Sequence, residues 1–120
     1  DNLVAIVDCN NLQLTDTTKN VMDLNSEDIS NKFKAFGFNT MIIDGHNVES
    51  IIDAFTKAKQ VKDKPTAIIA KTVKGKGVSF MENKVEWHGK APSDEEYKMA
   101  IDELIEKNKE IEKKAMEYAN

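Results

Sequence analysis

The chain has 120 residues, of which 40% are hydrophobic and 32% are charged, and its formal net charge is −4. This composition is typical of one folded globular domain and excludes a disordered chain. No apolar run approaches the roughly 18 residues of a membrane span, no signal-peptide pattern is present, and the acidic balance gives no reason to expect nucleic-acid binding.

Two residue types narrow the chemistry. The single cysteine, Cys9, excludes an internal disulfide and is compatible with a reducing cytoplasm. Its place at the end of the first strand could make it reactive, but we expect a small buried thiol instead. All 17 basic residues are lysines, so phosphate held by this chain must be met by lysine, by backbone N–H groups or by a metal ion. The chain starts at Asp1 and enters a strand almost at once, so we expect further sequence upstream.

The first apolar run, Leu3 to Val7, is rich in β-branched residues and predicts a strand buried on both faces. Asp8 ends the run, and Asn10 and Asn11 follow. Oxygens just beyond the carboxyl end of a parallel strand can converge on a ligand, and amide and carbonyl oxygens suit Mg²⁺ beside phosphate. The local pattern alone favours a turn, because asparagine tolerates left-handed backbone angles.

Two more strands and two helices are predicted over residues 26–72. Ser26 is the expected N-cap of the first helix, and Gly37 is its expected left-handed end. The strands are expected at residues 38–43 and 66–72, the second helix at 48–61, and an extended loop at 15–25. The residues expected to face the core are Ile29, Phe33 and Phe36 in the first helix and Ile51, Ile52, Phe55 and Ala58 in the second.

The rest of the chain is predicted as a flexible loop at 74–78, an irregular segment at 79–92 and a long helix. Ser93 and Glu96 form a capping box that opens this helix. Its apolar stripe either belongs to a solvated flank or meets a partner, and the pattern leaves both open. The stripe consists of Tyr97, Ile101, Leu104, Ile105, Ile111 and Ala115.

The order strand, helix, strand, helix, strand predicts an α/β fold: a three-layer arrangement of a parallel sheet with flanking helices, followed by the long C-terminal helix. The carboxyl ends of parallel strands share one edge, so Asn10, the turn at 44–47, Lys74 and His88 could meet there. Each signal is weak alone: Lys74-Gly-Lys-Gly77 is not a Walker loop, and a lone histidine such as His88 is more often structural. His46 is assigned to the turn.

Taken together, these segments resemble the thiamine-diphosphate-binding domain of transketolases over residues 2 to about 105. The resemblance points to the N-terminal subunit of a transketolase split into two chains. It implies that residues 1–92 are the C-terminal half of the diphosphate-binding domain and that residues 93–120 are its terminal amphipathic helix. The matching segments are Leu3-Val-Ala-Ile-Val-Asp8, Cys9-Asn-Asn-Leu12, Ala35-Phe-Gly-Phe38, Asp44-Gly-His-Asn47, Pro65-Thr-Ala-Ile-Ile-Ala-Lys-Thr-Val-Lys-Gly-Lys-Gly77 and Trp87-His-Gly89.

The resemblance also implies the site. Asn10 would bind the divalent ion through its side-chain oxygen and touch the diphosphate, and Leu12 would add its main-chain carbonyl to the metal shell. Leu14 would lie against the thiazolium ring of the cofactor. His88 would contact the diphosphate and the sugar donor as the catalytic histidine, and Lys74 would lie beside the diphosphate, as a lysine does in some members. The implied cofactors are thiamine diphosphate and Mg²⁺, with Ca²⁺ or Mn²⁺ left open.

Other parts of the family's site lie outside this sequence: the Gly-Asp-Gly metal motif, upstream histidines, and the glutamate of the pyrimidine-binding domain. We therefore expect this chain alone to be inactive, and to need a pyrimidine-binding domain or subunit within a homo-oligomer that acts on sugar phosphates. The alternatives are a related thiamine-diphosphate enzyme (1-deoxyxylulose-5-phosphate synthase or a 2-oxoacid dehydrogenase component) and a non-catalytic α/β association domain.

Overall fold

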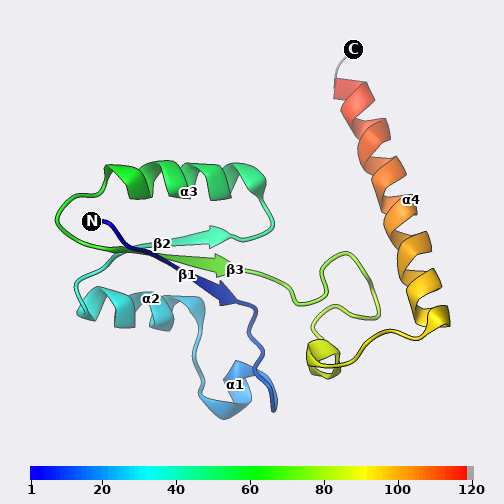
Figure 1. Ribbon diagram of the computed structural model, residues 1–120, viewed down its shortest axis with the longest axis horizontal. Helices are drawn as coiled ribbons and strands as arrows, with labels where there is room; N and C mark the ends of the chain where they lie inside the picture. Colours follow the sequence, from blue (N-terminus) through cyan, green and yellow to red (C-terminus); the bar gives the residue numbers. More distant parts are fainter. Residues whose placement is uncertain (119–120) are drawn as a thin grey trace. The chain divides into compact units, whose positions relative to one another are not determined.

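The computed structural model describes residues 1–118 and forms two compact units, Asp1–Lys74 and Gly75–Asn120, each treated by itself below (Figure 1). The first unit holds a sheet with its helices, and the second holds a short 3-10 helix and a long α-helix. In chain order the elements are β1 (Val4–Cys9), α1 (Thr18–Val21), α2 (Ser26–Ala35), β2 (Asn39–Asp44), α3 (Val48–Gln60), β3 (Thr66–Lys71), η1 (Val85–His88) and α4 (Asp94–Tyr118).

The three strands form one parallel sheet in the order β1-β3-β2. Val4 and Asn39 both pair with Thr66, so the last strand in sequence is the central one. α2 and α3 lie on opposite faces of the sheet (Figure 1). The predicted three-layer α/β fold with a parallel sheet is confirmed.

The best-formed part of the core lies under α2. Cys9 of β1 and Ile69 of β3 are buried on this face, and Ile29 and Phe33 of α2 pack against them. Phe38, just past α2, completes the cluster with its ring 5.1 Å from that of Phe33 in an edge-to-face arrangement. Gly37 between these two aromatic residues has a φ of 85°, so the predicted left-handed end of the helix is confirmed.

The opposite face of the sheet is only partly covered. α3 packs on β2, which leaves the side chains of β1 on this face open to solvent. Ile6 is 59% exposed, so the prediction that the first strand is buried on both faces is wrong. A cavity of about 260 Å³ lies on this face; its lining residues are Ile6, Asp8, Ile43, Gly45, Ile51, Phe55, Ile68, Ala70 and Thr72.

Several helix details differ from the predictions. Asn25, rather than Ser26, is the N-cap of α2: its side chain accepts the N–H of Asp28, whose carboxylate accepts the N–H of Asn25. Phe36 is 84% exposed because it lies at the C-cap beyond the reach of the sheet. Ile52 is also exposed, and Ala54 is buried in α3. Within the predicted loop at 15–25, α1 forms one short turn of helix.

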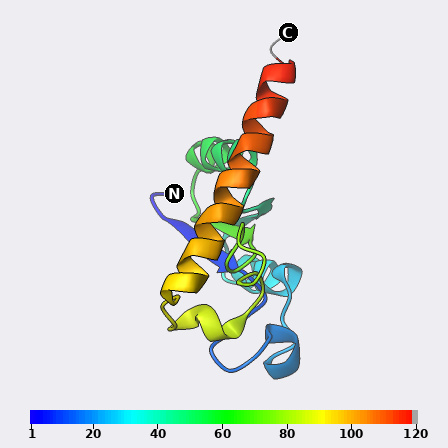
Figure 2. The same ribbon diagram turned by 90° about the vertical axis from the view of Figure 1, so that its right-hand side faces the viewer.

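The second unit contains η1, in the segment predicted as irregular, and α4, a single continuous helix (Figure 2). The capping box is confirmed: Ser93 Oγ accepts the N–H of Glu96, and the carboxylate of Glu96 accepts the N–H of Ser93. Residues 119–120 of the predicted helix lie outside the described residues. No helix within residues 1–118 combines the length and apolarity needed to cross a membrane.

Candidate functional site

The carboxyl ends of the three strands are joined by hydrogen bonds. Gly45 donates its N–H to the carbonyl of Lys71 at 2.8 Å, and Thr72 donates its N–H to the carbonyl of Cys9 at 3.2 Å. His46 Nε2 accepts the N–H of Val73 at 2.7 Å. This bond ties the turn after β2 to the end of β3, which gives His46 the structural role expected for it.

Asp8 and Thr72 form a polar pair at this edge that the sequence pattern did not single out. The hydroxyl of Thr72 donates to the carboxylate of Asp8 across the ends of β3 and β1. The only sequence signal was that each follows or ends an apolar strand, and their contact depends on the strand order. Both also line the cavity on the α3 face, so that cavity has one polar end.

Asn10 forms a turn directly after β1. Its side-chain oxygen accepts the backbone N–H of Leu12 at 2.9 Å, and Asn11 between them has a φ of 59°. Only oxygen can accept from an N–H, so this contact identifies which end of the amide faces Leu12. The turn expected from the local pattern is present. The amide oxygen keeps a second lone pair that this bond does not use.

The loop after Asn10 is closed on itself. Asn11 accepts the N–H of Thr18 through its carbonyl at 2.9 Å, and Gln13 donates its N–H to the carbonyl of Asp16 at 2.9 Å. These bonds bracket Leu12, whose own carbonyl accepts no hydrogen bond from the residues that the structure describes. The side chain of Leu14 is 70% exposed. The loop thus holds a carbonyl with unused lone pairs two residues after a fixed amide.

This donor set fits a hard divalent ion in type but not in number. Mg²⁺ takes near-octahedral oxygen coordination, to which Asn10 and the carbonyl of Leu12 would contribute two positions. Within residues 1–118, no group of three or more His, Cys, Asp or Glu side chains is arranged to hold a metal. The remaining ligands would have to come from a bound diphosphate, from water or from other residues.

The other predicted site residues lie apart from this loop along the chain. Lys74 is the last residue of the first unit. His88 ends η1 in the second unit, and its side chain is exposed. The structure brings Asn10 and Leu12 together on one loop, and His88 belongs to the other unit.

Cys9 lies beside the loop but is buried in the core under α2. Burial raises the pKa of its thiol, because a thiolate loses solvation there, and the carboxylate of Asp8 acts in the same direction. A thiol with a raised pKa is a poor nucleophile. Cys9 is therefore a core residue, as its pattern predicted.

Comparison with known proteins identifies a family. The model of the transketolase, thiamine diphosphate binding domain matches residues 1–114. An apulose-4-phosphate transketolase subunit from Phocaeicola vulgatus is 41% identical over 113 residues, which cover 94% of this chain and 40% of that protein. The 6-deoxy-6-sulfo-D-fructose transketolase subunit SqwG of a Clostridium species is 38% identical, with 87% of this chain and 37% of that protein covered.

Solved structures give the same result. A crystal structure of transketolase from Campylobacter jejuni superposes with a TM-score of 0.77 at 32% identity, and the match covers 86% of this chain and 16% of that one. A transketolase structure from Pichia stipitis, with a TM-score of 0.62 at 21% identity, shares the fold. The chain spans about two fifths of the length of the two subunit relatives and a smaller share of these structures.

Proposed function

The chain belongs to the family of the transketolase thiamine diphosphate binding domain, and on that premise we propose that it forms part of a transketolase. This enzyme would transfer a two-carbon ketol group between sugar phosphates with thiamine diphosphate and Mg²⁺. The observation that carries the proposal is the loop after β1 at the edge of a parallel sheet. A hydrogen-bonded turn fixes the amide of Asn10 there, and the carbonyl of Leu12 accepts no hydrogen bond from any described residue.

In this proposal the loop holds the metal and the diphosphate. Asn10 would bind the ion through the lone pair that its turn does not use, and Leu12 through its carbonyl. The turn lowers the entropy cost of binding, because the amide is already oriented before the ligand arrives. Leu14, exposed on the same loop, would cover the thiazolium ring. When bound, thiamine diphosphate supplies the carbanion chemistry, and the protein orients and surrounds it.

Lys74 would offset the negative charge of the diphosphate, and His88 would contact both the diphosphate and the sugar donor. Lys74 follows the end of β3 and would lie near the diphosphate, where an ammonium acts as a point charge. The side chain of His88 is exposed, so either ring nitrogen, Nδ1 or Nε2, can hydrogen-bond a ligand. We assign His88 as the catalytic residue of this chain.

The relatives support a split assembly. The two subunit relatives are named as transketolase subunits, and by analogy this chain would pair with a second subunit that carries the pyrimidine-binding domain, in a homo-oligomer of such pairs. The named relatives also favour ketol transfer over the reactions of 1-deoxyxylulose-5-phosphate synthase or 2-oxoacid dehydrogenases. We propose the cytoplasm as the compartment, in line with the single buried thiol.

The metal loop can be tested on this chain even if binding is weak. Mn²⁺ replaces Mg²⁺ at oxygen sites and broadens the NMR signals of nearby nuclei. We expect Mn²⁺ with thiamine diphosphate to broaden the backbone amide signals of residues 10–14 first in ¹⁵N-labelled chain. Asn10→Ala should raise the Mn²⁺ concentration needed for the same broadening at least about tenfold. Metal sites lose about 10–100-fold in affinity even when the residues that hydrogen-bond their ligands are removed.

Asn31→Ala is the matched control, because Asn31 is an exposed asparagine of α2 and far along the chain from the loop. It should leave the broadening unchanged. Broadening that is confined to exposed carboxylates, or that is equal in Asn10→Ala and the parent chain, would remove the loop from the site. Calorimetry should in addition detect no micromolar binding of Mg²⁺ and thiamine diphosphate by the chain alone, since Asn10 and Leu12 would supply two of the roughly six oxygen ligands that Mg²⁺ takes.

A further inference from the structure

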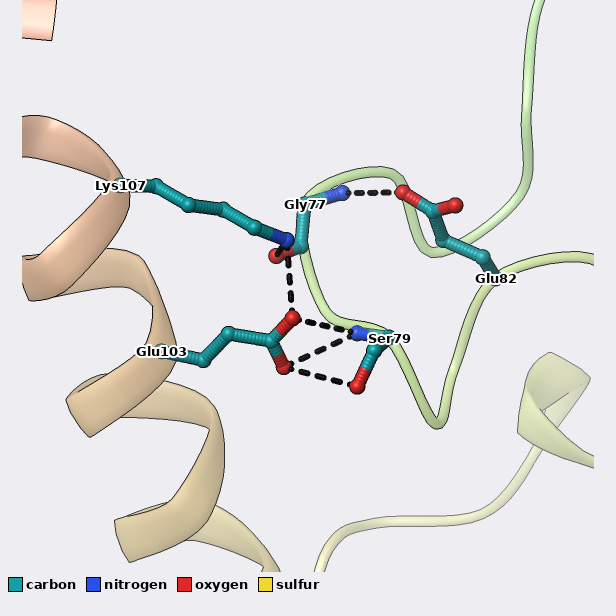
Figure 3. Close-up of polar contacts among 5 residues, drawn as sticks. All are labelled: Gly77, Ser79, Glu82, Glu103 and Lys107. Carbon is teal, nitrogen blue, oxygen red and sulfur yellow. Dashed lines mark hydrogen bonds and ion pairs between the residues drawn. The ribbon is translucent and has the colours of Figure 1, made fainter. Parts of the chain in front are cut away.

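The loop after Gly75 is bound to α4 by a network of polar contacts (Figure 3). Both carboxylate oxygens of Glu103 accept the N–H of Ser79 at 3.0 Å, and one also accepts its hydroxyl at 3.1 Å. Lys107 donates to the carbonyl of Gly77 at 2.6 Å and to Glu103 at 2.8 Å. The hydrogen bond from Lys107 and that from the Ser79 N–H lower the pKa of Glu103, so the carboxylate is ionised at neutral pH.

Residues 75–82 form a tightly closed loop, so a contact that holds one of these residues also restrains the others. Gly75 has a φ of 71°, and a Cβ there would lie 2.6 Å from the carbonyl oxygen of Met81. Gly77 donates its N–H to the carboxylate of Glu82 at 3.0 Å, and Met81 donates its N–H to the carbonyl of Val78 at 2.9 Å. Anchoring Ser79 to α4 therefore anchors residues 75–82 as a unit.

This loop leads to His88 through two neighbouring aromatic residues. Phe80 follows Ser79, and its carbonyl accepts the indole N–H of Trp87 at 3.3 Å. The rings of Phe80 and Trp87 lie 5.6 Å apart at an angle of 59°. Trp87 immediately precedes His88 in η1. A chain of contacts thus runs from Glu103 to Ser79, to Phe80, and to the residue beside the histidine.

A second anchor reaches Trp87 from the start of α4. The ammonium of Lys90 lies 4.1 Å from the centre of the Trp87 ring, a cation–π contact, and 2.6 Å from the carboxylate of Glu96. Glu96 and Glu103 are seven residues apart, about two helical turns, and so lie on one face of α4. Ala100, between them on that face, is buried. Two residues on one face of α4 are therefore linked to Trp87, Glu103 through Ser79 and Phe80, and Glu96 through Lys90.

We propose that Glu103 is a positioning residue, which fixes the Trp87–His88 segment through Ser79 and Phe80, and that the Lys90–Glu96 pair is its second anchor. Within the described part of the chain, no hydrogen bond or ion pair reaches the imidazole of His88. Its position is therefore set by the backbone that carries it. The inference rests on the proposed function, because the position of His88 affects the reaction rate only if His88 is the catalytic residue.

The test uses Trp87, the one tryptophan of the chain, whose fluorescence reports this segment without any substrate. We expect Glu103→Ala to shift the emission to longer wavelength and to raise acrylamide quenching at least about twofold, because the indole loses its held contact with Phe80. Glu103→Gln, which keeps one acceptor oxygen, should show a smaller change. Lys90→Met should act like Glu103→Ala, and Lys90→Arg should retain the parent signal.

Glu106→Ala is the matched control. Glu106 lies on the same helix, is exposed, and among residues 1–118 pairs only with Lys109 at 3.2 Å. It should leave the Trp87 signal unchanged, and far-UV circular dichroism should show the same helix content in both alanine variants. If Glu103→Ala and Glu106→Ala give the same Trp87 emission and quenching, or if Glu103→Ala changes only helix content, the positioning role is refuted.

Activity of the assembled enzyme separates this inference from the proposed function. If ketol transfer is present, Glu103→Ala should lower kcat by about ten- to a hundredfold, since misplacing a reacting group by about 1 Å can cost this much, while Glu106→Ala retains the parent rate. An unchanged kcat in Glu103→Ala, with Trp87 disturbed, would refute the catalytic meaning of the placement. Absence of ketol transfer in the parent assembly would refute the proposed function and leave the Trp87 result standing.

Discussion

The side-chain oxygen of Asn10 has two lone pairs, and the N–H of Leu12 uses one of them. A turn and a metal ligand are therefore compatible at this residue, although the sequence pattern presents them as alternatives. Cys9, one residue earlier, belongs to the core instead, because the alternation of β1 directs it toward α2. Cys9 and Asn10 are neighbours in sequence but have unrelated roles. Chemical modification of the Cys9 thiol therefore measures opening of the core and not the proposed metal site.

Modification of Cys9 provides a prediction at this scale. Burial raises the pKa of its thiol, and only the thiolate reacts with a disulfide reagent. We expect Ellman's reagent to react with the folded chain at pH 8 at least about tenfold more slowly than with the chain in urea, because reaction requires the core to open. Equal rates in the two conditions would show that Cys9 is accessible in the folded chain.

Among the elements, two helix ends were well predicted, the N-cap of α2 was misplaced by one residue, and helix faces were predicted less well. Gly37 and the Ser93–Glu96 box act through local hydrogen bonds and backbone angles, which the sequence contains. A period of 3.6 residues identifies an apolar face but not how far the sheet extends beneath it, which is why Phe36 and Ile52 proved exposed. The turn at Asn10 was predictable in the same local way. The Glu103–Ser79 contact was not, because its partners are 24 residues apart.

Acid should loosen the contacts made by α4. The pKa of Glu96 is lowered by the hydrogen bond from Lys90, and that of Glu103 by the hydrogen bond from Lys107. A lowered pKa in the folded chain adds stability above the ordinary pKa of glutamate, about 4.3, and this stability is lost as the pH falls through the folded value. We expect Trp87 fluorescence to change below about pH 4.3 in the parent chain and less in Glu103→Ala, where only the Lys90–Glu96 contact is left for acid to break.

At the scale of the whole molecule, the stability of the first unit is concentrated in its central strand. β3 is buried on both faces, whereas β1 is covered on one face only. This difference could not be read from the sequence, because the apolar runs of the two strands are alike and strand order sets which one is central. Whether the second face of β1 is covered depends on the tertiary arrangement, and the local sequence of the strand does not indicate it.

Two matched substitutions test this distribution of stability. Ile69→Ala should lower the free energy of unfolding by about 2–5 kcal/mol, because Ile69 is fully buried and its loss leaves a cavity. Ile6→Ala should cost no more than about 1 kcal/mol, the range of strand propensity, because Ile6 is largely exposed. Urea unfolding followed by circular dichroism measures both. Equal losses would mean that the open face of β1 is covered in solution.

The position of β3 also constrains the order of events during synthesis. β1 and β2 each pair with β3 and not with each other, so neither has a partner among the described strands until residue 71 has left the ribosome. Until then the apolar side chains of β1 and β2 have no β3 ladder to join, and unpaired strand edges of this kind are prone to aggregation. Slow, late closure of the sheet is the expected folding behaviour, since such pairings lie far apart in sequence.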